Sequence, residues 1–274
     1  MPSQYQPQIF GWISDLEKGG NYLTGADQRL LYANDNYCAF IRKTKSDQIF
    51  YLFMYLIVLI FLIPAIILWI LLIFVFNIEN ESKITILGIS AFTICCVAIY
   101  LVIPEIYHNL FTRRGSPIIF NRKTGKVYIN ESYFFNFKVL RNPLTFLHPN
   151  KKRIKEYDWA HLQGVVVHNF SRSSLNTTIL MVCKPHTHKT IDHILLDPLR
   201  AGIGSYLVWG WVNNFMCANK LAGLNDGKYK WEQETQFKEK IIKGQGWPEW
   251  MVEAFNATSQ QELAEIKQRH NITE

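Results

Sequence analysis

Two long stretches of apolar residues interrupt a chain that otherwise mixes apolar and polar positions. The first extends from Ile49 to Phe76, a run of 28 residues without a charge, and holds Pro64 near its middle. The second extends from Ile84 to Ile103 and has 20 residues, also without a charge. A helix needs about 20 apolar residues to cross a bilayer. The pattern therefore predicts a two-helix transmembrane hairpin, with a kink at the proline.

Small and charged residues around the two runs refine this hairpin. The second run contains the small residues Gly88, Ser90, Ala91 and Ala98, and small side chains let two membrane helices approach closely. The connector 77–83 carries two Glu and one Lys, whereas the outer flanks are basic. These flanking residues are Arg42, Lys43, Lys45, Arg113, Arg114, Arg122 and Lys123. The positive-inside rule then places both termini in the cytoplasm.

The pattern changes to short strands over residues 116–196. Residues 116–130 predict two strands around a turn at Asn121–Gly125, where Gly125 tolerates a positive φ. Further segments alternate or are rich in β-branched and aromatic residues, namely 133–140, 162–170, 177–183 and 188–196. Several short strands at near-regular spacing predict a small antiparallel β-barrel or sandwich.

Helices are expected on both sides of these strands. Thr24 followed by Asp27 resembles a helix start, so a short helix is predicted over 29–42. This helix lies either along the membrane face or against the C-terminal domain, and both alternatives stay open. A second helix is predicted from Pro198 to about Leu221, with Asp197 as its N-cap. It closes the β domain.

The final part of the chain reads as amphipathic helix with one interruption. The break is expected at Gly244 and Gly246, and a new helix begins at Pro248. Ser259 and Glu262 have the spacing of a capping box for the last helix. We expect this tail to cover an exposed edge of the barrel or to bind a partner.

Together these elements predict a membrane α-hairpin with an α+β cytoplasmic domain. The expected segments are a cytoplasmic N-terminal segment (1–48), the transmembrane hairpin (49–104), the β domain with its closing helix (105–222) and the helical tail (223–274). An aromatic content of 14% indicates that the flanking parts fold. The five cysteines are irregularly spaced and predict no disulfide framework.

The net charge of +7 fits attraction to anionic lipid headgroups. A basic loop around residues 148–155 holds the candidate lipid-binding residues Lys151, Lys152, Arg153 and Lys155. The alternative is a solvated hairpin tip. No aromatic and basic residues alternate beside this loop, so nucleic acid is not expected as a partner.

Candidate chemistry concentrates in the segment Cys183–His193. His186, His188 and His193 are candidate metal ligands, but zinc needs three or four converging ligands. Polar residues of an exposed hairpin are the preferred interpretation. Asp158 and His161 can form a pair, for which a structural role is the preferred interpretation. Catalytic and phosphate-binding motifs are absent from the sequence, so we expect a non-enzymatic protein without a cofactor.

Three stretches carry a resemblance to a known group of proteins: PIIFNRKTGKVYIN, EYDWAHLQGVVVHN and GSYLVWGWVNNF. They resemble bacterial membrane-anchored proteins with a pleckstrin-homology-like domain. More narrowly, they are similar to a proteobacterial inner-membrane family of unknown function associated with type VI secretion loci. The resemblance covers about residues 40–220, with Gly125 and Trp159 at its turn and packing positions.

The resemblance implies a pleckstrin-homology-like fold at the bacterial inner membrane. It further implies an immunity or accessory protein that binds a cognate effector or a secretion component. Two alternatives stay open. One is a membrane-active toxin or pore-forming subunit, since uncharged spans with small residues can oligomerise. The other is a membrane-bound enzyme that uses the histidine-rich segment.

Overall fold

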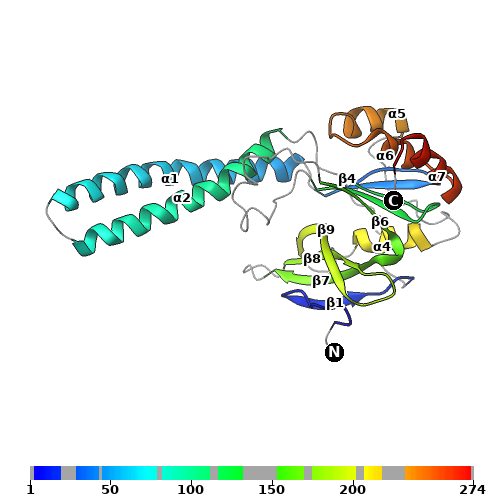
Figure 1. The fold of residues 1–274 in the computed structure, drawn as a ribbon, viewed down its shortest axis with the longest axis horizontal. Coiled ribbons are helices and arrows are strands. Elements are labelled where there is room, and N and C mark those ends of the chain that lie inside the picture. Colours follow the sequence, from blue (N-terminus) through cyan, green and yellow to red (C-terminus); the bar gives the residue numbers. More distant parts are fainter. Residues whose placement is uncertain are drawn as a thin grey trace. The chain divides into compact units, whose positions relative to one another are not determined.

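The computed structural model in Figure 1 describes residues 3–19, 29–42, 45–78, 82–111, 117–131, 153–169, 175–201, 207–217 and 232–272. These residues belong to two compact units. One unit contains the two long helices of residues 44–113, and the other contains the β-sheets and the remaining helices. The predicted strand 133–140, Lys151 and Lys152 lie outside the described residues.

Two helices form the first unit, as the sequence predicts. They are α1 (Lys45–Ile78), which continues through Pro64, and α2 (Ser82–Phe111). Their stretches Ile49–Val75 and Ile86–Ile103 are long and apolar enough to cross a membrane, with mean hydropathies of 3.4 and 2.6. Large apolar side chains cover the hairpin surface; Phe61, for example, is 72% exposed. Apolar surface of this extent is unfavourable in water and typical of contact with lipid.

Helices α1 and α2 approach each other closely at Gly88. A Cβ atom at this glycine would lie 2.8 Å from Cγ1 of Ile73 and 3.8 Å from Cε3 of Trp69. The absence of a side chain therefore lets the two helices pack together at this position. The expected role of a small residue is confirmed here.

Two antiparallel sheets form the second unit. The four-stranded sheet has the order β1 (Trp12–Leu16), β7 (Leu162–Asn169), β8 (Leu175–Cys183), β9 (Thr190–Ala201). The five-stranded sheet has the order β2 (Leu30–Ala33), β3 (Tyr37–Ile41), β4 (Pro117–Asn121), β5 (Lys126–Asn130), β6 (Ile154–Asp158). A 3₁₀ turn, η2 (Trp159–His161), leads from β6 into β7. The described residues thus form two separate sheets and not a closed barrel.

The described N-terminal residues include strands β1, β2 and β3 of these sheets, so the predicted helix over 29–42 is wrong. Strands β2 and β3 form a hairpin in which the side chain of Asn34 accepts hydrogen bonds from the backbone N–H groups of Asn36 and Tyr37. Such an Asx turn competes with helix formation. Side chains along β3 then alternate between two cores, which is the period of a strand.

The membrane hairpin is inserted between two paired strands. β3 and β4 are antiparallel neighbours, with Ile41 opposite Pro117, and both α1 and α2 lie between them in the chain. The turn between β4 and β5 follows the prediction, since Gly125 has a φ of +63°. Strands β1 to β3 precede the hairpin and β4 to β9 follow it. The second unit, which we call the β unit, is therefore discontinuous in sequence.

A helix and the two sheets enclose the main core. Helix α4 (Leu207–Cys217) contributes Trp209 and Trp211, both fully buried among side chains of both sheets. Gly164 in β7 allows the close approach of this helix, because a Cβ there would lie 2.8 Å from the ring of Trp209.

The closing helix is shorter than predicted, because residues 197–201 continue strand β9. Asp197 lies opposite Thr178, and Ala201 lies opposite Leu175. Pro198 lacks an N–H group but is tolerated, since β9 is an edge strand with an irregular register at this point.

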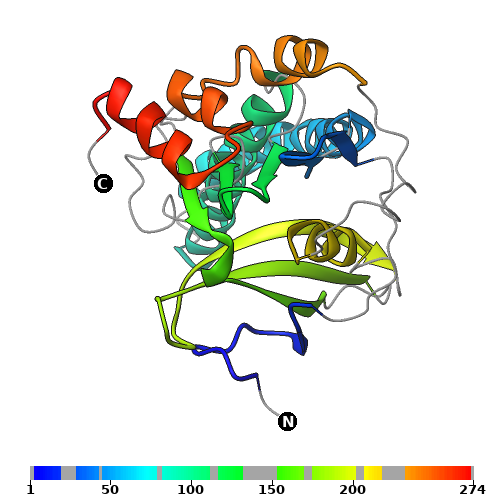
Figure 2. The same ribbon diagram turned by 90° about the vertical axis from the view of Figure 1, so that its right-hand side faces the viewer.

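The C-terminal helices cover the outer face of the five-stranded sheet (Figures 1 and 2). They are α5 (Glu234–Phe237), the π-helical turn η4 (Lys238–Ile242), α6 (Glu249–Ala254) and α7 (Gln260–Arg269). Gly244 and Gly246 have φ values of +86° and +75°, which confirms the predicted break. Ser259 caps α7 by accepting a hydrogen bond from the backbone N–H of Glu262. The tail thus covers a face of the sheet instead of an edge.

Candidate functional site

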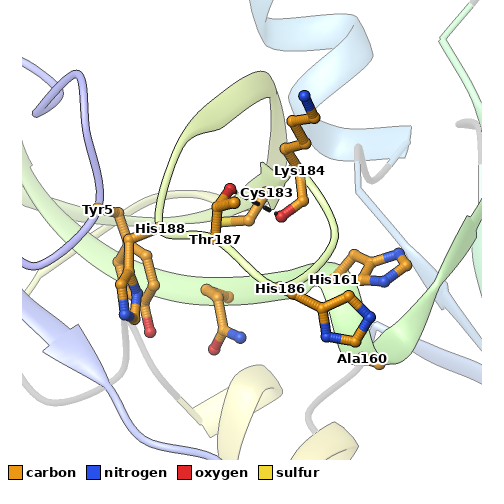
Figure 3. A pocket seen from close by; sticks show the side chains of 9 residues that line it. Tyr5, Ala160, His161, Cys183, Lys184, His186, Thr187 and His188 are labelled. Carbon is orange, nitrogen blue, oxygen red and sulfur yellow. Dashed lines mark hydrogen bonds between the residues drawn. The ribbon is translucent and has the colours of Figure 1, made fainter.

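A hollow of about 290 Å³ lies where the β8–β9 turn meets η2 and the N-terminal segment. We call it the histidine pocket. Its described lining residues are Tyr5, Ala160, His161, Gln163, Cys183, Lys184, His186, Thr187 and His188. Figure 3 shows His161 and His186 at one end of the pocket and His188 with Tyr5 at the other.

The turn between β8 and β9 is held by its own hydrogen bonds. The backbone N–H of Lys184 donates to the carbonyl of Lys189 at 2.8 Å, and the N–H of Thr187 donates to the carbonyl of Lys184 at 3.0 Å. His186 has a φ of +57°, a left-handed conformation that histidine adopts more readily than most residues. The turn therefore presents His186 and His188 from a defined backbone.

The N-terminal segment lines the pocket beside His188. The N–H of Gln6 donates to the carbonyl of His188 at 2.9 Å, and the ring of Tyr5 lies 5.7 Å from the ring of His188. The carboxylate of Asp15 accepts hydrogen bonds from the side chains of Ser3 and Trp12, at 2.8 and 2.7 Å. These contacts fix Tyr5 at the pocket.

Lys18 stabilises the turn η2, which lines another side of the pocket. Its ammonium group donates to the carbonyls of Trp159 and Ala160 and lies 4.8 Å from the centre of the Trp159 ring. Burial lowers the pKa of Lys18 to about 8. His161 Nδ1 lies 3.7 Å from Oδ2 of Asp158, so the predicted pairing of these two residues is confirmed.

The three candidate metal ligands separate in the structure. His186 and His188 line the histidine pocket, whereas His193 is exposed on β9, opposite Met181. Within the described ranges, no three His, Cys, Asp or Glu side chains are grouped to hold a metal ion. Burial raises the pKa of the Cys183 thiol, which keeps it protonated and a weak nucleophile. The pocket thus offers hydrogen-bond donors and imidazoles for binding a ligand.

Of the candidate lipid-binding residues that the structure describes, Lys155 takes part in ion pairs within the fold. Lys155 pairs with Asp192 and lies 3.8 Å from Oε2 of Glu131. The hydroxyl of Tyr157 donates to Asp192 at 2.8 Å, so the edge strands β6 and β9 are joined by side chains. Burial lowers the pKa of Arg153. The ammonium group of Lys155 therefore already has the carboxylates of Asp192 and Glu131 beside it.

One of the basic residues before the hairpin is also part of the fold. Arg42 is 1% exposed, donates to the carbonyl of Asn130 at 2.6 Å and lies 3.7 Å from Glu131. Burial lowers its pKa to about 10, which leaves the guanidinium charged at neutral pH. In this position Arg42 stabilises the end of β3 and does not face lipid.

Comparison with known proteins gives a match to a protein family. The model of a family described as a family of unknown function (DUF6708) matches residues 95–250, more than half of the chain. The chain belongs to the DUF6708 family. No curated protein and no solved structure matches it. The DUF6708 match includes η2 and the β8–β9 turn, and Tyr5 lies outside it.

The DUF6708 pocket unites two clusters that appear separate in the sequence. Leu162 pairs with Val182 across β7 and β8, which brings His161 beside Cys183 and the histidines that follow. The pair Asp158–His161 and the segment Cys183–His188 therefore belong to one site. Tyr5 and Gln163 carry no motif, and only the strand register identifies Gln163 as a neighbour.

Proposed function

We propose that this DUF6708 chain is a membrane-anchored binding module of the bacterial inner membrane. The observation that supports this most is the insertion of the apolar hairpin between the paired strands β3 and β4. Only residues 42–44 connect β3 to α1, and only residues 112–116 connect α2 to β4. The β unit is thus tethered to the bilayer by two short connections, and an anchor of this kind suits a domain that binds at the membrane.

The same insertion favours a hairpin with both ends on one side of the bilayer. Strands β3 and β4 belong to one sheet, so α1 must begin on the side where α2 ends. The ends of the hairpin carry basic residues at Lys43, Lys45, Arg113 and Arg114, whereas the connector carries Glu79 and Glu81. The positive-inside rule places the β unit in the cytoplasm. Buried Arg42 does not contribute to this argument.

A protein is the proposed partner of the module. The described residues expose Phe10, Ile13 and Ile191 on the β unit, at 82%, 44% and 62%. Apolar side chains at a polar surface are common in contacts between proteins. The resemblance to proteins of type VI secretion loci makes a cognate effector the partner to test first, with this chain as its immunity or accessory protein.

The test is purification of the full chain from membranes in detergent, together with the products of neighbouring genes. We expect one of them to co-purify and the chain to protect cells against the neighbouring toxin. Absence of a stable partner and of protection would contradict the proposal. Loss of membrane potential on overexpression would instead support a pore-forming subunit.

A further inference from the structure

We propose that the histidine pocket binds the phosphate group of a small phosphate monoester. This inference concerns a ligand and does not depend on a protein partner of the module. It rests on the donor chemistry of the pocket walls, on the charges around them and on the size of the hollow.

Several hydrogen-bond donors line the pocket. Imidazoles come from His161, His186 and His188, and further N–H and O–H donors come from Gln163 and Tyr5. The hydroxyl of Thr187 already donates to the carbonyl of Lys184. Among the described lining residues none is a carboxylate. A phosphate monoester carries about 1.5 to 2 negative charges at pH 7 and three strong acceptor oxygens. It matches such walls better than a carboxylate, which has two oxygens and one charge.

Nearby carboxylates are already engaged by other groups. Asp158 lies 2.7 Å from the ammonium of Lys126 as well as near His161. Asp192 accepts from Lys155 and Tyr157. Asp15 accepts from the N-terminal segment. Asp158 and Asp192 are thus paired with lysines, whereas Asp15 accepts hydrogen bonds from neutral donors.

Three lysines belong to the segments next to the pocket. Lys184 and Lys189 belong to the β8–β9 turn, and Lys18 binds the carbonyl of Ala160 under the pocket. Figure 3 shows the side chain of Lys184 directed away from the imidazoles, so it contributes at longer range. Charges within about 10 Å still act on an anion at moderate ionic strength. These lysines contribute a positive potential at the pocket.

Size limits the rest of the ligand. A volume of about 290 Å³ lies just below the range of about 300–1,000 Å³ that is typical of small-molecule sites. The pocket holds a phosphate with a short organic group and not a nucleotide or a larger cofactor. His186 also has the left-handed backbone conformation that is frequent at ligand sites.

The experiment measures the chemical shifts of the histidine side chains. The full chain is labelled with ¹³C at the Cε1 atoms of its histidines, held in maltoside micelles and titrated with inorganic phosphate and with glycerol 3-phosphate. We expect saturable shifts of His161, His186 and His188, with His193 and His168 unchanged. Acetate at equal ionic strength should give no saturation.

Variants make the test specific. The double substitution His161→Gln and His186→Asn removes two imidazoles, and asparagine tolerates the positive φ at position 186. It should weaken binding at least about tenfold, because two charge-assisted hydrogen bonds are lost. His193→Gln removes an exposed histidine of β9 outside the pocket and should bind like the original chain. An unchanged thermal unfolding midpoint would show that each variant is folded.

The source of the phosphate is decided by a second arm. Nanodiscs of phosphatidylcholine with phosphatidic acid present the same monoester on a lipid, and pure phosphatidylcholine is the control. Shifts with glycerol 3-phosphate support a soluble ligand, and shifts with phosphatidic acid alone support a lipid. Absence of saturable shifts in every arm, or equal affinity of the double variant, would overturn the proposal.

Discussion

Ile41 and Pro117 face each other across strands β3 and β4, although the whole helical hairpin lies between them in the chain. The five-stranded sheet therefore cannot be completed until both helices have been synthesised. Packing of α1 against α2 brings the two strand ends together and shortens the effective loop, which reduces the entropy cost of closing it. Assembly of the hairpin and folding of the β unit are thus coupled.

The first prediction concerns that helix contact. Gly88→Leu forces a side chain into the space occupied by Ile73 and Trp69. We expect the hairpin to lose about 1–3 kcal/mol of stability, seen as a lower thermal unfolding midpoint in detergent. Ser90→Leu, at an exposed position of the same helix, is the control and should have little effect. Equal midpoints for both variants would contradict the close packing at Gly88.

The second prediction concerns the core of the β unit. Gly164→Ala places a methyl group 2.8 Å from the buried ring of Trp209, and neither the strand nor the indole can yield easily. We expect a loss of about 1–3 kcal/mol in the free energy of unfolding. Gln163→Ala, one residue away at the edge of the pocket, is the matched control. Denaturant unfolding measures both, and a neutral Gly164→Ala would refute this packing.

Asn121 is the centre of the third prediction. Its amide donates to the carbonyls of Phe255 and Ala257, at 3.1 and 2.9 Å, while its oxygen accepts from the N–H groups of Lys123 and Thr124. Asn121→Asp keeps the acceptor and turns the donor into a charge facing carbonyls. We expect about 3 kcal/mol or more of destabilisation. Limited proteolysis should then cut first within residues 232–260, and an unchanged cleavage pattern would argue against this role.

Sequence patterns predicted the parts of the fold that local order decides. The hairpin, the β4–β5 turn at Gly125, strands β7 and β8 and the cap at Ser259 are local features and agree with the structure. Residues 29–42 became strands because β3 pairs with a segment beyond the hairpin. Residues 197–201 became strand because β8 lies beside them. Long-range pairing decides such cases, and local propensity cannot show it.

The candidate site shows the same difference between local sequence features and long-range strand pairing. The sequence identified His186, His188 and the pair Asp158–His161, because these residues are close together in the chain. Their union in one pocket depends on the register of β7 against β8. Tyr5 joins only because the N-terminal segment hydrogen-bonds to the β8–β9 turn.

Lys18 gives a prediction for pH. Burial lowers its pKa from 10.5 to about 8, so between these values the unfolded chain binds more protons than the folded one. The free energy of unfolding therefore rises with pH in this window. Below pH 8 both states are protonated and the penalty is constant. Relative to Lys18→Met, the original chain should gain about 1 kcal/mol from pH 8 to 10.5, because solvent screens a partly buried group. Unfolding midpoints of both chains across this range measure the gain, and a constant difference would contradict it.

Membrane association with and without the hairpin is the most direct test of the proposed anchor. In a shortened chain, a Gly-Ser turn replaces residues 43–116 and joins β3 directly to β4. We predict that the full chain stays in the membrane pellet after carbonate washing, whereas the shortened chain is soluble and unfolds cooperatively. Release of the full chain by carbonate would contradict the anchor. A shortened chain that stays with membranes or fails to fold would contradict a β unit interrupted by its own membrane hairpin.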